Sequence, residues 1–187
     1  SCYTNQYANI HRGNYELSSK LTKRFEDSRE KIARYLNTSS RNIIFVKSAT
    51  EGINLISSSM SSIYLEDGDE VIISYLEHHA NIIPWHLVNK KIKIVPLNIN
   101  SNGEIILEEL KEKINKNTKL ISLTHMSNVT GSITNFDKIK DINKNFKVPL
   151  LIDGCQYAPH KKVNLQELDP DFYVFSAHKI YGPSGLG

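Results

Sequence analysis

Residues 172–187 read Phe-Tyr-Val-Phe-Ser-Ala-His-Lys-Ile-Tyr-Gly-Pro-Ser-Gly-Leu-Gly, an apolar run followed by a lysine and a turn rich in glycine and proline. Short runs of aromatic and β-branched residues are typical of buried strands. A lysine just beyond such a strand, here Lys179, lies at the rim of a sheet, where open α/β folds bind their ligands. On its own this pattern more often belongs to a solvated surface lysine. Other parts of the chain are therefore needed to show whether Lys179 binds a ligand.

A second apolar run also ends in polar side chains. Residues 147–156 read Lys-Val-Pro-Leu-Leu-Ile-Asp-Gly-Cys-Gln, so this predicted strand finishes close to Asp153 and Gln156. The interval from Asp153 to Lys179 leaves room for a connection back to a neighbouring strand. An amine and a carboxylate at adjacent strand ends suit an aldehyde cofactor with a ring nitrogen, because the amine can attach the cofactor and the carboxylate can keep the nitrogen protonated. We therefore expect pyridoxal 5'-phosphate as the cofactor.

The phosphate of such a cofactor needs a cradle, and a helix N-terminus provides one through its free N–H groups and its dipole. Residues 41–47 predict a strand that runs into a helix beginning near Ser48. Ser48 and Glu51 have the spacing of a capping box, and Thr50 offers a hydroxyl group to a phosphate. An ordinary helix cap is the alternative, but the lysine and the aspartate elsewhere in the chain favour the phosphate site.

The order of predicted elements defines the fold class. Strands are expected at residues 43–47, 71–75, 92–96, 119–124, 149–152 and 172–176, and helices at 18–36, 50–63, about 80–90, 105–116 and 137–146. Strands that alternate with helices predict an α/β fold with a mostly parallel, doubly wound sheet flanked by helices. A chain of 187 residues, 40% of them hydrophobic, can bury a core and is expected to form one domain.

Composition argues against several classes of function. The net charge of +3 is small and no basic run is interleaved with aromatic residues, which argues against nucleic-acid binding. No window is long and apolar enough to predict a membrane span. Two cysteines do not make a secreted disulfide framework, so a reducing compartment is expected.

The histidines do not predict a metal centre. The run Glu77-His78-His79 fails as a zinc site, because adjacent histidines do not face one metal and no further ligands have suitable spacing. Structural roles are expected for four of the histidines, namely His79, His86, His125 and His160.

Six stretches of the chain match one known family in the same order and at the same spacings. They are Asn-Ile-His-Arg-Gly (9–13), Ser-Ala-Thr-Glu-Gly-Ile-Asn-Leu (48–55), Glu-His-His-Ala-Asn-Ile-Ile-Pro-Trp (77–85), His-Met-Ser-Asn-Val-Thr-Gly (125–131), Asp-Gly-Cys-Gln (153–156) and Asp-Phe-Tyr-Val-Phe-Ser-Ala-His-Lys-Ile-Tyr-Gly-Pro (171–183). On these stretches the chain resembles the Suf-type cysteine desulfurases, within the class V aminotransferase group of fold-type-I pyridoxal phosphate enzymes.

The resemblance implies a role for each matching residue. Lys179 is expected to hold the cofactor and act in catalysis, and Asp153 to pair with the ring nitrogen. His78 is expected to stack on the ring and to move protons. Gln156 and Asn128 are expected near the phenolic oxygen of the ring.

Further residues are implied for the phosphate and for a dimer. The expected phosphate ligands are the Ala49 N–H and the side chains of Thr50, Ser176 and His178. The segment with His11 and Arg12 lies, in this family, near the active site across the interface of a homodimer.

The chain departs from the family pattern at three places. The family usually has Gly-Thr-Thr where residues 48–50 are Ser-Ala-Thr, histidine where Tyr15 stands, and a small residue where Cys155 stands. These differences leave one phosphate hydroxyl and the role of position 15 open. Cys155 is expected to be a packed thiol rather than a nucleophile.

The implied activity is the removal of sulfur from L-cysteine, which gives alanine and an enzyme persulfide for iron–sulfur cluster assembly. A sulfur-acceptor protein of the Suf system is the expected partner. The alternatives are a selenocysteine lyase, another class V enzyme such as a kynureninase-like hydrolase, or a catalytically silent fragment.

Members of the family are longer than this chain. We therefore expect residues 1–187 to form an incomplete cofactor-binding large domain. The C-terminal small domain, the persulfide cysteine and the arginine for the substrate carboxylate are expected outside it, so the chain alone should not turn over cysteine. A plastid-derived organelle or the cytoplasm is the expected compartment.

Overall fold

The computed structural model describes residues 2–187, with side chains from residue 4 onward. The chain divides into two compact units. The larger comprises Phe45–Lys162 with Leu168–Gly187, and the smaller comprises the preceding residues up to Ile44 together with Val163–Glu167. All of the predicted cofactor residues lie in the larger unit.

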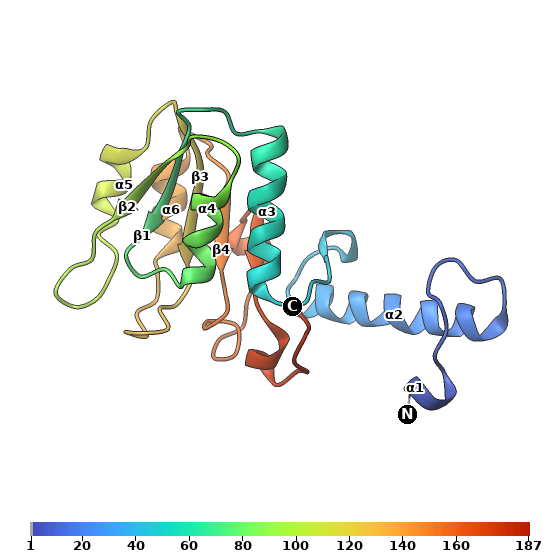
Figure 1. The fold of residues 1–187 in the computed structure, drawn as a ribbon. Helices are drawn as coiled ribbons and strands as arrows, with labels where there is room; N and C mark the ends of the chain where they lie inside the picture. Colours follow the sequence, from blue (N-terminus) through green and yellow to red (C-terminus); the bar gives the residue numbers. More distant parts are fainter. Residues whose placement is uncertain (1) are drawn as a thin grey trace. The chain divides into compact units, whose positions relative to one another are not determined.

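The larger unit is built on a five-stranded sheet whose strands all run parallel, in the order β2-β1-β3-β4-β5 (Figure 1). The strands are β1 (Glu70–Ser74), β2 (Lys93–Leu97), β3 (Thr118–Thr124), β4 (Leu150–Asp153) and β5 (Phe172–Val174). The chain adds β2 on one side of β1 and all later strands on the other side. This order puts a topological switch point between β1 and β3, where open α/β sheets form a ligand-binding crevice.

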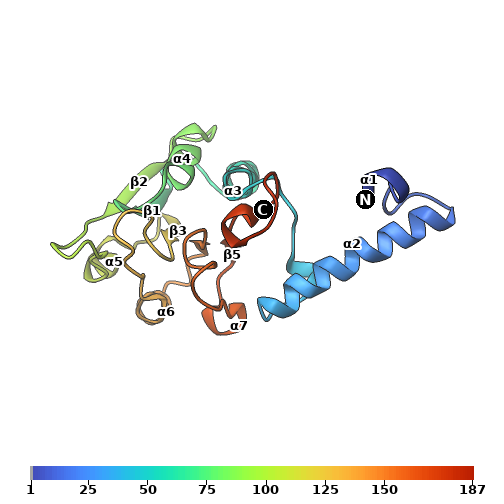
Figure 2. The same ribbon diagram turned by 90° about the horizontal axis from the view of Figure 1, so that it is seen from below.

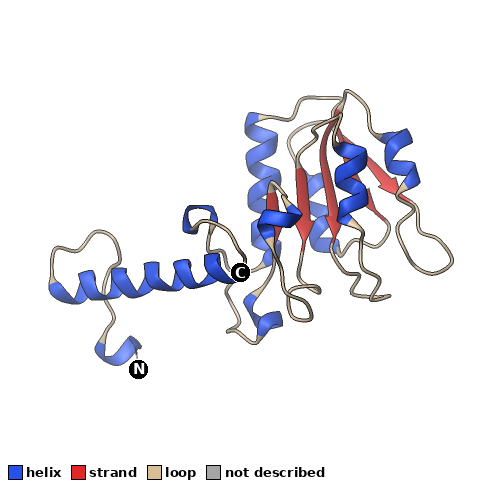
Figure 3. Ribbon diagram, turned by 180° about the vertical axis from the view of Figure 1, so that it is seen from behind, coloured by secondary structure: helices blue, strands red, loops and turns tan. Residues whose placement is uncertain are grey.

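Helices cover both faces of the sheet, which confirms the doubly wound architecture (Figures 2 and 3). The helices of this unit are α3 (Ala49–Ile63), α4 (Ile83–Leu87), α5 (Glu108–Lys113) and α6 (Phe136–Asn143). A further short helix, α7 (Leu165–Leu168), begins in residues assigned to the smaller unit and ends at the first residue of the larger unit's last segment. Figure 2 shows α3 and α4 on one side of the strands and α5 and α6 on the other.

Alternation along the strands explains the two apolar layers, because successive side chains of a strand point to opposite faces. On one face, Val71 and Leu120 pack in a cluster with Ile53 of α3 and Trp85 of α4. On the other face, neighbouring strand residues pack in a second cluster that includes Leu110 of α5 and Ile139 of α6. The strands read as nearly continuous apolar runs because both faces are buried.

Two predicted elements were wrong. Residues 43–47 form no strand, although Val46 exchanges two backbone hydrogen bonds with Gly187, at 2.9 and 2.7 Å between N and O. These two bonds join a single pair of residues and do not make the repeated pairing between neighbouring segments that defines a strand. The helix expected over about 80–90 is instead a 3-10 turn (His79–Asn81) followed by the short α4, because Pro84 lies in the first turn of α4 and Val88 turns to extended backbone.

Other boundaries moved by a few residues. The helices expected at 105–116 and 137–146 shorten to α5 and α6, and β5 ends at Val174 because Ser176 already caps a 3-10 turn (Ala177–Ile180). No helix within residues 2–187 is long and apolar enough to cross a membrane.

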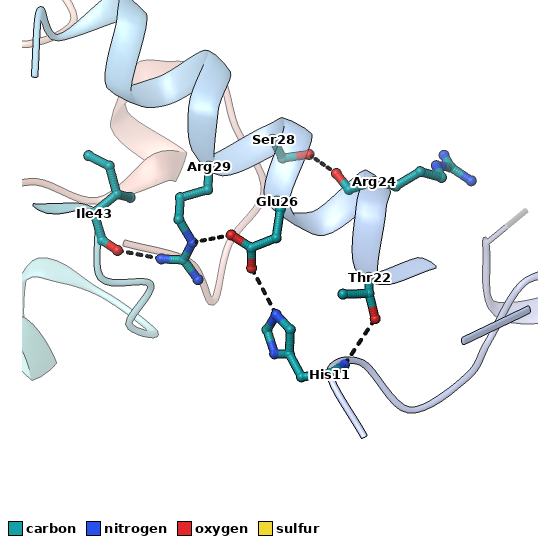
Figure 4. Close-up of polar contacts among 7 residues, drawn as sticks. All are labelled: His11, Thr22, Arg24, Glu26, Ser28, Arg29 and Ile43. Atoms are coloured by element: carbon teal, nitrogen blue, oxygen red, sulfur yellow. Dashed lines mark hydrogen bonds and ion pairs between the residues drawn. The ribbon is translucent and has the colours of Figure 1, made fainter. Parts of the chain in front are cut away.

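The smaller unit consists mainly of α2 (Glu16–Tyr35), with α1 (Cys2–Asn5) and a 3-10 turn (Ser40–Asn42). Figure 4 shows how α2 is tied to the segments before and after it. Glu26 accepts a hydrogen bond from His11 Nε2 at 2.8 Å and pairs with Arg29 Nε at 3.1 Å. Arg29 also donates to the Ile43 carbonyl. The hydrogen bond from His11 is the main reason that the pKa of Glu26 is lowered.

The buried layers predict the cost of core substitutions. Leu120 is fully buried in β3, so Leu120→Ala should lower the free energy of unfolding of the protein that carries this chain by about 2–5 kcal/mol, measured by denaturant unfolding. Ile63 at the end of α3 is 86% exposed, so Ile63→Ala should change it by less than about 0.5 kcal/mol. Equal effects of the two substitutions would contradict the assigned core.

Candidate active site

The carboxyl ends of the parallel strands bring most of the predicted site residues to one edge of the sheet. Ser74, Thr124 and Asp153 are the last residues of β1, β3 and β4. Ser176 and Lys179 follow β5, in the cap and the 3-10 turn beyond it. Side chains on different segments therefore meet here because the strands run the same way.

Asp153 is a buried carboxylate, with 5% of its surface exposed. Its Oδ1 accepts a hydrogen bond from the Cys155 N–H at 3.0 Å. It forms no ion pair with any described residue. Because buried charges in proteins are normally paired, this carboxylate suits a cationic partner such as a protonated ring nitrogen. The residues present at the end of β4 thus fit the expected cofactor.

Strand pairing brings the segments that carry Asp153 and Lys179 together, because Asp153 is paired with Val174 of β5 and the Lys179 N–H donates to the Ser176 carbonyl just beyond that strand, at 3.2 Å. The pKa of the Cys155 thiol between them is raised to about 12, mainly by burial, with the Asp153 carboxylate acting in the same direction and Lys179 in the opposite one. A thiol with this pKa stays protonated at neutral pH, which agrees with the packed role expected for Cys155.

The start of α3 is joined to the end of β5 by a buried hydrogen bond. The Ala49 N–H donates to Ser176 Oγ at 2.9 Å, so two of the expected phosphate ligands are in direct contact. Gly52 allows this approach, because a Cβ there would lie 3.3 Å from the Val174 side chain. Thr50 and His178 are exposed beside this contact in the sequence. The Ala49 N–H is thus engaged by Ser176 in this structure, and the positive end of the α3 dipole faces the segment that carries Lys179.

The capping box at this helix is only half formed. Ser48 Oγ accepts the Glu51 N–H at 3.2 Å, as the spacing predicts. The Glu51 carboxylate accepts the N–H of Lys47 rather than that of Ser48. Ser48 therefore acts as an ordinary helix cap, which was the alternative to a phosphate site at this residue. Ala49 and Thr50 form the first residues of the helix.

Three predicted residues lie on loops near this edge without contacts to the others. His78 is exposed and caps the 3-10 turn by accepting the Ala80 N–H at Nδ1, at 3.1 Å. Asn128, after β3, is exposed, and Gln156, after β4, is half-buried. Neither amide side chain makes a hydrogen bond to another residue of 4–187. Their roles stay predictions.

The remaining histidines behave differently from one another. His125 is buried and stacks on Tyr157 with 3.5 Å between ring centroids, and burial lowers its pKa to about 4. His79, His86 and His160 are exposed. Within the described residues, no group of three or more histidine, cysteine or acidic side chains is arranged to hold a metal ion.

Glu77 is the site residue that motif reasoning missed. Its buried carboxyl group lies between the ends of β1 and β3 and accepts hydrogen bonds from Ser74, Asn81 and Thr124. Burial is the main reason that its pKa rises to about 7. The signal in the sequence was its place directly before His78, but a charged residue beside a histidine pair gives no indication of burial.

Known proteins resemble this chain in sequence. A cysteine desulfurase from Wigglesworthia glossinidia brevipalpis is 43% identical over 186 residues, which cover 97% of this chain and 45% of that protein. This bacterial relative gives no support to the expected plastid-derived compartment.

Solved structures agree with the fold. A cysteine desulfurase from Escherichia coli superposes with a TM-score of 0.88 at 36% identity, covering 99% of this chain and 47% of that one. An apo cysteine desulfurase from Thermococcus onnurineus NA1 gives a TM-score of 0.91 at 31% identity, covering 98% and 46%. These matches confirm the predicted fold class.

The chain thus spans about half the length of the relatives that it matches. The family model described as aminotransferase class-V matches residues 1–187, the whole of the chain. Together with the parallel sheet and the lysine and aspartate at its carboxyl edge, this match shows that the chain belongs to the class V aminotransferase family.

Proposed function

We propose that this chain is the cofactor-binding part of a cysteine desulfurase, which removes the sulfur atom of L-cysteine and leaves alanine. One observation carries the proposal: the buried Asp153 carboxylate ends β4 beside β5, and the segment after β5 carries Lys179 and is joined to the start of α3 by the Ala49–Ser176 hydrogen bond. A buried acid, an amine and an anion-binding helix end are the three parts that pyridoxal phosphate chemistry takes from a protein. The relatives named above support the choice of substrate.

The residues that would hold pyridoxal 5'-phosphate are the ones expected from the sequence. Asp153 would keep the ring nitrogen protonated, and His78 would cover one face of the ring. The phosphate would be held by the α3 terminus and nearby side chains, namely Ala49, Thr50, Ser176 and His178, and the phenolic oxygen by Asn128 and Gln156. When bound, the cofactor supplies an electron sink for the bonds of the amino-acid α-carbon.

The reaction then consists of proton transfer by Lys179 and of sulfur transfer to a protein thiolate. The Lys179 amine takes the α-proton of L-cysteine and returns a proton to the product. A protein thiolate attacks the substrate sulfur, so that a sulfur–sulfur bond forms while the carbon–sulfur bond breaks. The electron pair of the broken bond passes to the β-carbon, which takes up the proton that the thiol released, giving alanine and a protein persulfide. Cys155 does not serve as this thiolate, because its pKa of about 12 keeps it protonated. Another residue of the protein supplies the nucleophile.

The finer parts of the proposal concern the biological setting. We place the enzyme in the Suf type, as a homodimer that passes persulfide sulfur to an acceptor protein for iron–sulfur cluster assembly. Residues 1–187 form the partial large domain of that enzyme. A selenocysteine lyase or a kynureninase-like hydrolase would share this site and differ in substrate, so a comparison of L-cysteine, selenocysteine and kynurenine as substrates distinguishes them.

Lys179 provides the first test of this function. In the protein that carries this chain, Lys179→Ala should abolish covalent cofactor attachment, assayed by borohydride reduction and mass spectrometry. Loss of the proton-transfer group should also reduce alanine formation by at least about 100-fold. A reduced cofactor adduct on a different lysine of the wild-type protein would show that Lys179 is not the lysine that attaches the cofactor.

Asp153 provides the second test. Asp153→Asn removes one partner of a buried charge pair, a loss worth about 3–5 kcal/mol. It should therefore weaken cofactor retention during dialysis and slow exchange of the substrate α-proton with solvent. Asp141, which is exposed on α6, gives the matched control: Asp141→Asn should change neither measurement. The same behaviour in both variants would count against the site.

Cys155 provides the third test. Because its thiol stays protonated at neutral pH, Cys155→Ala should leave persulfide formation within about threefold of the wild type, a change below 1 kcal/mol in barrier. Persulfide is measured by alkylation and mass spectrometry after one turnover with L-cysteine. Complete loss of the persulfide in a variant that still holds the cofactor would show that Cys155 is the nucleophile.

A further inference from the structure

The carboxyl group of Glu77 is held at the switch point of the sheet by groups from three segments. It accepts hydrogen bonds from Ser74 Oγ at the end of β1 (2.5 Å), from the Thr124 N–H at the end of β3 (3.0 Å) and from Asn81 Nδ2 (2.7 Å). The residue is 8% exposed and forms no ion pair with a described residue. All three partners are uncharged.

The direction of these hydrogen bonds is determined by the chemistry of the partners. Asn81 Oδ1 accepts from Trp85 Nε1 at 3.3 Å and from Ser122 Oγ at 2.6 Å. Because an indole nitrogen can only donate, Asn81 must turn its oxygen to Trp85 and its NH₂ group to Glu77. The Thr124 N–H can also only donate. Both oxygens of Glu77 therefore face groups that have to donate.

This arrangement excludes an amide at position 77. Thr124 donates to Oε1 of Glu77, and Asn81 donates to Oε2. A glutamine would place its own NH₂ group against one of these donors, whichever way it was turned. Unpaired buried donors are costly, so the site requires a carboxyl group and not merely a polar side chain.

The same hydrogen bonds fix the turn that carries His78. Glu77 directly precedes His78, and Asn81 follows it at the end of the 3-10 turn. Through Glu77 and Asn81 the turn is attached to β3 at Thr124 and Ser122, and to α4 at Trp85. Among the described residues, the one hydrogen bond to the His78 ring comes from the Ala80 N–H of its own turn. The buried carboxyl group therefore sets the backbone from which the imidazole projects.

We propose that Glu77 is a positioning residue, which holds the His78 imidazole against the cofactor through the turn 77–81. This inference rests on the proposed function, since it assigns His78 to the cofactor face. Glu77 does not touch the cofactor and acts through His78. A glutamine, which differs in one atom, should disturb the turn because it cannot accept from both Thr124 and Asn81.

A double-mutant cycle with the cofactor tests the coupling to His78. The dissociation constant of pyridoxal 5'-phosphate is measured by absorbance titration of the cofactor-free protein. Glu77→Gln and His78→Ala should each weaken binding by about tenfold, the scale of one hydrogen bond to a charged group. The double variant should be no weaker than His78→Ala alone, because Glu77 acts through His78. Losses that multiply in the double variant would overturn the proposal.

A rescue and a control complete this experiment. Glu77→Gln combined with Asn81→Asp reverses the hydrogen bond between the two side chains and restores an acceptor to every donor, so binding should return toward the wild-type value. Asn81→Asp alone sets two carboxylates against each other and should bind poorly. Glu112→Gln, an exposed substitution on α5, should leave binding unchanged. Failure of the rescue in a folded double variant would also overturn the proposal.

The cofactor-free protein gives an independent reading if the proposed function is wrong. The ring resonances of His78, assigned by comparison with His78→Ala, should shift in Glu77→Gln and return in the double rescue variant. Failure of the wild type to bind the cofactor would reject the proposed function but leave this measurement intact. Unchanged His78 resonances in Glu77→Gln would reject the positioning role itself.

The acid–base behaviour of Glu77 adds a test that needs no cofactor. The pKa of its carboxyl is raised from 4.5 to about 7, mainly by burial, with the Asp153 carboxylate at the end of β4 acting in the same direction. Ser74, Thr124 and Asn81 carry no charge, and the Ser74 hydroxyl can either donate to the carboxylate or accept from the protonated acid. The site therefore tolerates both forms.

The expected stability profile follows from the sign of this shift. The folded state holds the proton more tightly than the unfolded state, so the contribution of Glu77 is complete below pH 4.5 and is lost as the pH rises to about 7. The difference in unfolding midpoint between the wild type and Glu77→Gln should shrink over this window. His125 also titrates, with a lowered pKa, but it is present in both proteins and cancels. Parallel profiles would contradict a buried acid at position 77.

Discussion

The site depends on one constraint: all five strands of the sheet run in the same direction. The loops that follow β1, β3, β4 and β5 therefore meet at a single edge, although the residues they carry are spread from Ser74 to Lys179 in the sequence. The reversal of strand order next to β1 opens this edge between β1 and β3. Glu77 occupies that position and joins the two strand ends.

Two buried carboxyl groups give the edge its electrostatic character, and they are satisfied in different ways. Glu77 is surrounded by three uncharged donors, and burial raises its pKa to near neutral. Asp153 accepts a backbone N–H and has no cation paired with it among the described residues. The Asp153 carboxylate therefore suits an incoming cation, whereas the hydrogen-bonded Glu77 carboxyl group stabilises the structure around it.

Much of the fold could be predicted from local patterns. Helical spacing of apolar residues identified α2 and α3, and apolar runs identified β1, β3 and β4 within a few residues. The strand expected at 43–47 failed because a strand needs a ladder of hydrogen bonds to a neighbouring strand, and Val46 is bonded to Gly187, which belongs to no strand. The helix expected over about 80–90 failed because Pro84 allows a helix only to begin near it and Val88 turns to extended backbone.

By itself the sequence determined the alternation of strands and helices, the family, and the residue types suited to the cofactor, since periodicity and short motifs are properties of neighbouring residues. Only the tertiary structure decided which of those residues meet. It joined Ala49 to Ser176, set Asp153 beside the strand that leads to Lys179, and buried Glu77 in the turn that carries His78. Such contacts link residues far apart in the chain, so they arise from strand order and packing, which no local pattern encodes.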